Sequence, residues 1–72
     1  MTDISVKGEF IKLDAFLKFA NIVCSGGEAK ILIADGQVFV NGEPCTMRGK
    51  KLHDGDQVVT AGGETFVVRT GN

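Results

Sequence analysis

The chain has 72 residues, which is enough for one small domain and too few for a catalytic domain beside a recognition domain. Hydrophobic residues make up 43% of it, but the formal net charge of -1 gives no support to nucleic-acid binding, since domains that bind nucleic acid are often strongly basic. No stretch is long and apolar enough to span a bilayer, and the first residues do not resemble a secretion signal. We therefore expect one domain over residues 1–72, located in the cytoplasm and without a membrane partner.

The two cysteines, Cys24 and Cys45, are predicted to be free thiols, because small disulfide-stapled domains usually carry more cysteines and a secretion signal. With His53 as the one histidine, the chain also has too few ligands for a structural zinc site of its own. We predict no metal and no cofactor. Cys24 ends the short apolar segment 22–24, and we expect it to be buried as a small hydrophobic residue.

The N-terminal third of the chain predicts a strand followed by a helix. Apolar and polar residues alternate over residues 4–7, as in a half-buried strand. A helix is predicted over residues 13–20, where apolar residues recur at the i, i+3, i+4, i+7 spacing of one buried face. Asn21 is a suitable end for this helix, since asparagine tolerates the left-handed conformation.

A second helix is predicted to start at Ser25. With Glu28 three residues later this serine forms a capping box, in which both side chains accept hydrogen bonds from early backbone N–H groups. Gly26 and Gly27 allow two interpretations: they leave these N–H groups open to a phosphate, or they only form a tight turn between the helices. Gly36 is expected to end the helix in a left-handed conformation. The buried face of this helix is predicted to consist of Ala29, Leu32 and Ile33.

A hairpin is predicted after the second helix. Residues 38–40 read as a strand, and the Asn41-Gly42 pair that follows is typical of a tight hairpin turn, because both residues accept positive φ. Pro44 cannot donate a backbone hydrogen bond, so the returning strand is predicted to be brief or to lie at an edge.

The last third predicts a loop and a second hairpin. Residues 46–53 carry no strand pattern and are expected to form a loop. Asp54 and Asp56 flank a glycine, which turn chemistry explains better than a pair of catalytic carboxylates. Strands over residues 57–60 and 65–69 are predicted to pair as a hairpin, and the N-terminal strand is expected to join the same sheet.

Catalysis is not predicted for this chain. A nucleophile needs a base within reach, and the available candidates are Cys24 or Cys45 with His53, neither of which lies in a known nucleophile motif. We therefore predict that the protein is not an enzyme and has no small-molecule substrate.

A basic segment lies between Pro44 and His53, where Arg48, Lys50 and Lys51 occur without an acid. If the helices pack against the hairpin, these cations are expected to share one face with two lysines near the helices and with the start of the second helix. Spaced cations beside a helix N-terminus suit a phosphate backbone. The charge pattern alone favours the alternative, an ordinary solvated surface.

Several short segments occur together at spacings that match a known family. They are KLDAFL at residues 12–17, Ser25 with EAK at 28–30, GQVFVNG at 36–42 and LHDGD at 52–56. Over residues 10–59 this pattern resembles the S4 RNA-binding domain, which also occurs in pseudouridine synthases and tyrosyl-tRNA synthetases. The greatest similarity is to small stand-alone bacterial S4 proteins, some of them linked to ribosomal large-subunit assembly, which share the patterns GGxAK and RGKKLxDGD.

The resemblance implies an S4-like α+β fold, with two short helices packed on a small, mostly antiparallel sheet of four to five strands. It further implies that structured RNA, most simply ribosomal RNA, is bound across both helices and the adjacent basic loop through phosphate contacts. The role implied is non-catalytic and lies in ribosome assembly. The residues predicted to bind RNA are Lys12, Ser25, Gly26, Gly27, Lys30, Arg48, Lys50 and Lys51.

Two places depart from the pattern of the family. Many S4 domains carry an arginine directly after the serine, where this chain has Gly26. Many also carry a basic residue beside the glycine before the strand, whereas Asp35 and Gln37 flank Gly36 here. Both changes remove positive charge from the expected RNA face, so we expect a modest affinity and a need for a preassembled ribosomal surface.

A second class of function stays open, namely a small protein-interaction adaptor or a sulfur-carrier-like β-rich protein without RNA binding. Sulfur carriers share the leucine-x-aspartate-glycine-aspartate pattern, but they need a terminal Gly-Gly, and this chain ends in Thr70-Gly71-Asn72. That ending counts against a carrier. The modest net charge slightly favours an adaptor.

Overall fold

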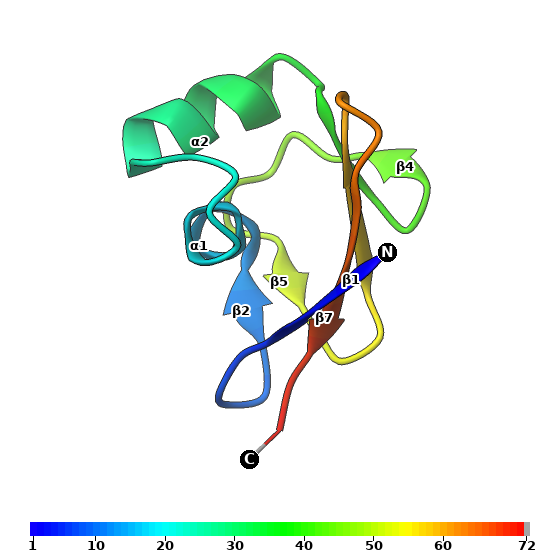
Figure 1. Ribbon diagram of the computed structural model, residues 1–72. Helices are drawn as coiled ribbons and strands as arrows, with labels where there is room; N and C mark the ends of the chain where they lie inside the picture. The colour runs from blue at the N-terminus through cyan, green and yellow to red at the C-terminus, as the bar shows by residue number, and fades with distance from the viewer. Residues whose placement is uncertain (72) are drawn as a thin grey trace.

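The computed structural model describes residues 1–71, so the last residue of the expected domain, Asn72, lies outside the described part. This part contains two α-helices and seven short strands (Figure 1). In chain order the elements are β1 Thr2–Ser5, β2 Ile11–Lys12, α1 Leu13–Phe19, α2 Gly26–Ala34, β3 Val38–Val40, β4 Glu43–Pro44, β5 Lys51–Leu52, β6 Gln57–Thr60 and β7 Thr65–Arg69.

Five strands form the main sheet, in the order β1-β7-β6-β3-β4. The β1–β7 pair is parallel and the other pairs are antiparallel. The predicted α+β fold and the β6–β7 hairpin are therefore confirmed, and the N-terminal strand joins the same sheet. Its position differs from the expectation: the strand covers Thr2–Ser5, two residues earlier than predicted, and Val6 follows with an N–H that donates to the Arg69 carbonyl at 2.8 Å.

The predicted hairpin after the second helix is also confirmed. Asn41 and Gly42 have φ angles of 52° and 87°, the positive values that a tight hairpin turn requires. The returning strand β4 has only two residues and lies at the edge of the sheet. At an edge, the missing N–H of Pro44 does not interrupt the hydrogen bonding of the sheet.

A second, two-stranded sheet replaces part of the predicted loop. β5 lies inside residues 46–53 and pairs antiparallel with β2, with Ile11 opposite Leu52 and Lys12 opposite Lys51. The prediction of a continuous loop was wrong because Leu52 is fully buried, and β2 runs directly into α1, which brings a partner strand beside it. The pairing joins segments that are far apart in the chain, so no local pattern indicates it.

Both helices lie on the same side of the strands and cover the core (Figure 1). α1 buries Leu13, Phe16 and Leu17 completely, and the ring of Phe16 meets that of Phe66 edge-on at a centroid distance of 6.5 Å. Each fully buried leucine or phenylalanine contributes about 1.5–3 kcal/mol from apolar burial. The core thus fixes α1 to the sheet.

α2 buries a narrower face than predicted. Ala29 and Ile33 are fully buried, whereas Leu32 is only half-buried and Ile31 is 65% exposed. The predicted left-handed end at Gly36 is confirmed by its φ of 72°. Within residues 1–71, neither helix has the length and apolar character needed to cross a bilayer.

The expectation that Cys24 is buried was wrong, because its side chain is exposed. Val23 fills the core position at this point, and the chain then turns outward toward the start of α2. The Cys24 N–H donates to the Glu28 carboxylate at 3.0 Å, which holds the residue at the outer end of the helix.

Candidate nucleic-acid interface

The basic loop, defined here as residues 46–51, is fixed by its backbone to the start of α1. The N–H of Leu13 donates to the Lys50 carbonyl at 2.9 Å, and the N–H of Asp14 donates to the Arg48 carbonyl at 3.2 Å. The N-cap residue Lys12 makes no capping bond with its own side chain. Because a helix start carries N–H groups without intrahelical partners, the loop carbonyls take the place of a side-chain cap.

This backbone attachment gathers four exposed cations around the start of α1. Lys12 and Lys51 face each other across the β2–β5 pair, and Arg48 and Lys50 follow from the two carbonyl bonds. Within residues 1–71 the one ion pair joins Arg69 to a distant aspartate, so none of the four cations is neutralised by a carboxylate at ion-pair distance. Four positively charged side chains therefore remain available on one part of the surface.

Lys51 has a further contact that restrains its side chain. Its Nζ lies 4.9 Å from the centroid of the Phe10 ring, a cation–π geometry. Phe10 in turn lies beside His53, with ring centroids 6.2 Å apart. These rings hold the ammonium group near the end of the basic loop.

The start of α2 is built differently. The serine half of the predicted capping box is confirmed, since Ser25 Oγ accepts the Glu28 N–H at 3.3 Å. The Glu28 carboxylate also reaches back, but it accepts the N–H of Cys24, the residue before the cap. The exposed N–H groups of Gly26 and Gly27 lie in the first turn, where no intrahelical partner exists. A carboxylate and two open N–H groups thus stand together at this end.

The two interpretations of Gly26 and Gly27 can be compared with their backbone angles. Neither glycine has a positive φ, and the left-handed residue of the interhelical turn is Asn21, with a φ of 63°. A Cβ at Gly26 would meet nothing within 4 Å. The turn therefore does not require glycine at these positions on conformational or steric grounds.

The predicted RNA-binding residues fall into two groups. One group lies together at the start of α1 and consists of Lys12, Arg48, Lys50 and Lys51. The other belongs to α2 and its N-cap and consists of Ser25, Gly26, Gly27 and Lys30. The two helices pack against each other, which connects the groups through the core. Whether these residues contact RNA stays a prediction.

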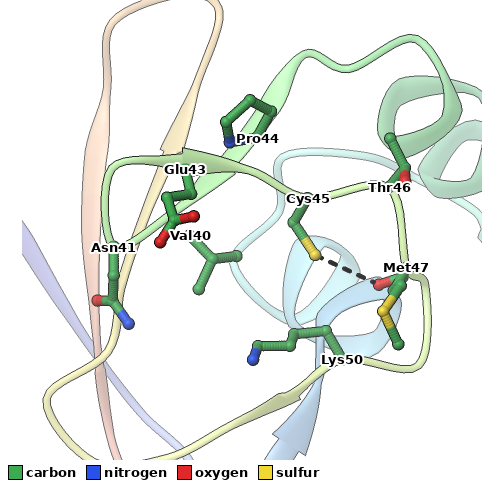
Figure 2. A pocket seen from close by; sticks show the side chains of 8 residues that line it. All are labelled: Val40, Asn41, Glu43, Pro44, Cys45, Thr46, Met47 and Lys50. Carbon is green, nitrogen blue, oxygen red and sulfur yellow. Dashed lines mark hydrogen bonds between the residues drawn. The ribbon is translucent and has the colours of Figure 1, made fainter.

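An open pocket of about 340 Å³ adjoins the basic loop (Figure 2). Its lining includes apolar side chains of Val40, Pro44 and Met47, and the Cys45 Sγ lies 3.8 Å from the Met47 carbonyl oxygen. Lys50 also lines the pocket, with Glu43 on the hairpin, and the two do not form an ion pair. The pocket thus combines an apolar lining with one exposed lysine at its edge.

Sequence reasoning missed a polar network that joins the hairpin to the turn between β5 and β6. Asn41 Nδ2 donates to Asp56 Oδ1 at 3.2 Å, and the Gln57 N–H donates to Asn41 Oδ1 at 2.9 Å. Asp56 also accepts the His53 N–H at 2.8 Å. The predicted turn chemistry at Asp56 is thereby confirmed. Asn41 and Asp56 each lie in a segment that matches the family pattern, but no local spacing indicates that their side chains meet.

The candidate groups for other chemistry do not come together. Neither Cys24 nor Cys45 forms a hydrogen bond with His53 in the part of the chain that the structure describes. In the same part, no three His, Cys, Asp or Glu side chains gather closely enough to hold a metal ion.

Comparison with known proteins gives two matches. The family model described as S4 domain matches residues 4–69, which is more than the segment 10–59 that carries the resemblance in sequence. The protein named "Probable ribosome maturation protein RlbA" of Bacillus subtilis (strain 168) is 45% identical over 65 residues, which cover 90% of this chain and 92% of the relative.

Proposed function

This chain belongs to the S4-domain family, and from that premise we propose that it is a non-catalytic RNA-binding protein that recognises structured RNA. The observation that carries the proposal is the group of four cations around the start of α1, which are placed by backbone hydrogen bonds and have no carboxylate partner among residues 1–71. Cations positioned in this way can contact phosphates without first breaking ion pairs of their own.

The way in which RNA is recognised follows from the types of side chain present. The deep groove of an A-form helix hides its base edges, so such RNA is recognised mainly through its backbone and shape. The cations of the basic loop supply phosphate contacts, which position a protein on nucleic acid without reading the sequence. We therefore propose phosphate and shape recognition by Lys12, Arg48, Lys50 and Lys51.

The start of α2 extends this interface. Gly26 and Gly27 offer exposed N–H groups, and Lys30 adds one cation on the same helix. Backbone N–H groups at a helix start are suited to bind a phosphate. The start of α1 has four cations and α2 has one, so we propose that α2 contributes less to the affinity than the basic loop does.

The name of the B. subtilis relative points to the maturation of ribosomes. We propose the corresponding role for this chain, with ribosomal RNA as the partner and the cytoplasm as the place of action. The net charge of -1 supports a modest affinity for isolated RNA, because the cations are few and local. A partly assembled ribosomal subunit would then add contacts that free RNA lacks.

Fluorescence anisotropy across a salt series tests the proposal on the wild-type chain. A structured ribosomal RNA fragment, a single-stranded RNA and a DNA duplex of matched length serve as ligands. We expect the structured RNA to bind most tightly, with an affinity that falls as salt rises, by about 0.7–0.9 in the logarithmic slope per phosphate contact. Binding of the structured RNA no tighter than that of the DNA duplex would refute the proposal.

A further inference from the structure

A second hollow, the α2 groove, lies between α2, the connector before it and the β6–β7 turn, and has a volume of about 460 Å³. Its apolar lining consists of Ile22 and Val23 from the connector between the helices, Ile31 and Leu32 from α2, and Ala61 from the β6–β7 turn. The N–H of Ala61 donates to the Gln37 carbonyl at 2.9 Å, so the turn is fixed against the chain that leaves α2. The walls of the groove are therefore held in place relative to one another.

α2 presents apolar side chains on two faces. Ala29 and Ile33 face the core, while Ile31 points outward and is 65% exposed. Leu32, the next residue, is half-buried and lines the same groove. The groove side of α2 thus carries apolar surface that nothing in residues 1–71 covers.

The charges along the α2 groove have one sign. Glu28 and Asp35 both line it, and no lysine or arginine does. These two residues are seven positions apart, or about 10 Å along a helix, so the carboxylates lie near opposite ends of the groove. One Glu28 oxygen accepts the Cys24 N–H, and the other has no hydrogen-bond partner within residues 1–71.

Lys30, the cation that α2 contributes to the proposed RNA face, lies on a different side of α2 from the groove. At 3.6 residues per turn, Lys30 is roughly 160° around the helix from both Glu28 and Leu32. A partner in the groove would leave Lys30 accessible. The two surfaces also differ in charge, since the RNA face is cationic and the groove is acidic.

We propose that the α2 groove binds a cationic segment of a second protein that also carries an aliphatic side chain. The aliphatic side chain would pack on Ile31 and Leu32, and flanking lysines or arginines would pair with Glu28 and Asp35. The opposite charge of groove and segment and the apolar lining together specify this partner. Such binding goes beyond the proposed RNA role, because it would let one small chain hold RNA and a basic protein segment at the same time.

The test uses a short labelled peptide of alternating lysine and leucine as the probe, with binding followed by fluorescence anisotropy. Peptides of the same length that alternate glutamate with leucine, or lysine with serine, separate the charge requirement from the apolar one. We expect the lysine–leucine peptide to bind and the other two to bind at least roughly tenfold more weakly.

Ile31→Ser removes the apolar contact, and Phe19→Ser is its matched control, since Phe19 is 60% exposed and does not line the groove. We expect Ile31→Ser to weaken peptide binding about tenfold, whereas Phe19→Ser leaves it unchanged. Asp35→Lys is expected to abolish binding, and Glu9→Lys, an exposed change elsewhere, to have little effect. Thermal unfolding of each variant is the control that checks whether the fold is kept.

Two results would overturn the inference. One is equal binding of the glutamate–leucine and lysine–leucine peptides. The other is that Ile31→Ser and Phe19→Ser weaken binding of the lysine–leucine peptide equally, or that neither of them weakens it. RNA binding by Ile31→Ser and Phe19→Ser, which change no charge, is expected to stay at the wild-type level, so failure of the groove proposal is distinguishable from failure of the RNA proposal.

Discussion

The two helices of this protein begin in different ways. The first two N–H groups of α1, those of Leu13 and Asp14, are satisfied from outside the helix by the carbonyls of Lys50 and Arg48. The next one, of Ala15, donates to the Asp14 carboxylate at 2.8 Å. At α2, the side chains of Ser25 and Glu28 form the cap from within the local sequence. Both arrangements solve the same problem, the unpaired N–H groups of a helix start.

The difference explains where positive charge gathers. A cap made by loop carbonyls leaves the loop side chains free, so the cations beside α1 point to solvent. A cap made by side chains uses those side chains for bonding. Each helix start also carries one carboxylate, Asp14 at α1 and Glu28 at α2, so the difference in charge comes from the cations of the loop. The comparison therefore predicts that α1 depends on the basic loop for its attachment and its charge, whereas α2 depends on its own cap.

The largest effect is expected from loss of the anchor of the basic loop. Leu52 is fully buried and follows the loop directly, so Leu52→Ala leaves a cavity beneath β5. We expect the free energy of unfolding to fall by about 2–5 kcal/mol, measured by urea denaturation. Ile31→Ala, which truncates an exposed aliphatic side chain on α2, is the control and should change it by less than about 0.5 kcal/mol. Similar losses in the two variants would show that Leu52 does not anchor the loop.

A smaller effect separates the two caps directly. Ser25→Ala removes the oxygen that accepts the Glu28 N–H, so it should lower the free energy of unfolding by about 1 kcal/mol. Lys12→Ala, at the equivalent position of α1, should change it by less than about 0.5 kcal/mol, because the Lys12 side chain makes no capping bond. Chemical denaturation of both variants measures the difference. A Lys12→Ala loss as large as that of Ser25→Ala would contradict the distinction between the caps.

The smallest effect is a gain at α2. Gly26→Arg adds the cation that many S4 domains carry after the serine, and the structure leaves open space for a Cβ there. We expect a steeper salt dependence of RNA binding, by about one phosphate contact, with a correspondingly higher affinity at low salt. Gly26→Gln controls for the longer side chain without the charge. An equal gain from glutamine would mean that charge at this position is irrelevant.

Much of the fold could be predicted because the signals are local. The capping box at Ser25, the Asn41-Gly42 turn and the β6–β7 hairpin each depend on residues a few positions apart. The β2–β5 pair could not be predicted, because it joins distant segments and each strand has two residues. The exposure of Cys24 was also missed, since an apolar run does not show at which residue the chain turns outward.

The candidate interface was only partly predictable for a related reason. The cations of the basic loop are visible in the sequence, but their position depends on carbonyl bonds to α1, which any residue type can make. The link between Asn41 and Asp56 depends equally on the tertiary fold. The sequence thus identifies the charged groups, and the backbone geometry determines which of them lie together.

The most direct test compares two double variants that each remove two exposed cations. Arg48→Ala with Lys50→Ala alters the basic loop, and Lys7→Ala with Lys18→Ala is the matched control away from it. Anisotropy with the structured ribosomal RNA fragment should show a salt slope shallower by about two for the loop variant, and an unchanged slope for the control. Equal changes in both variants, or an unchanged slope for the loop variant, would contradict the claim that RNA phosphates contact the basic loop.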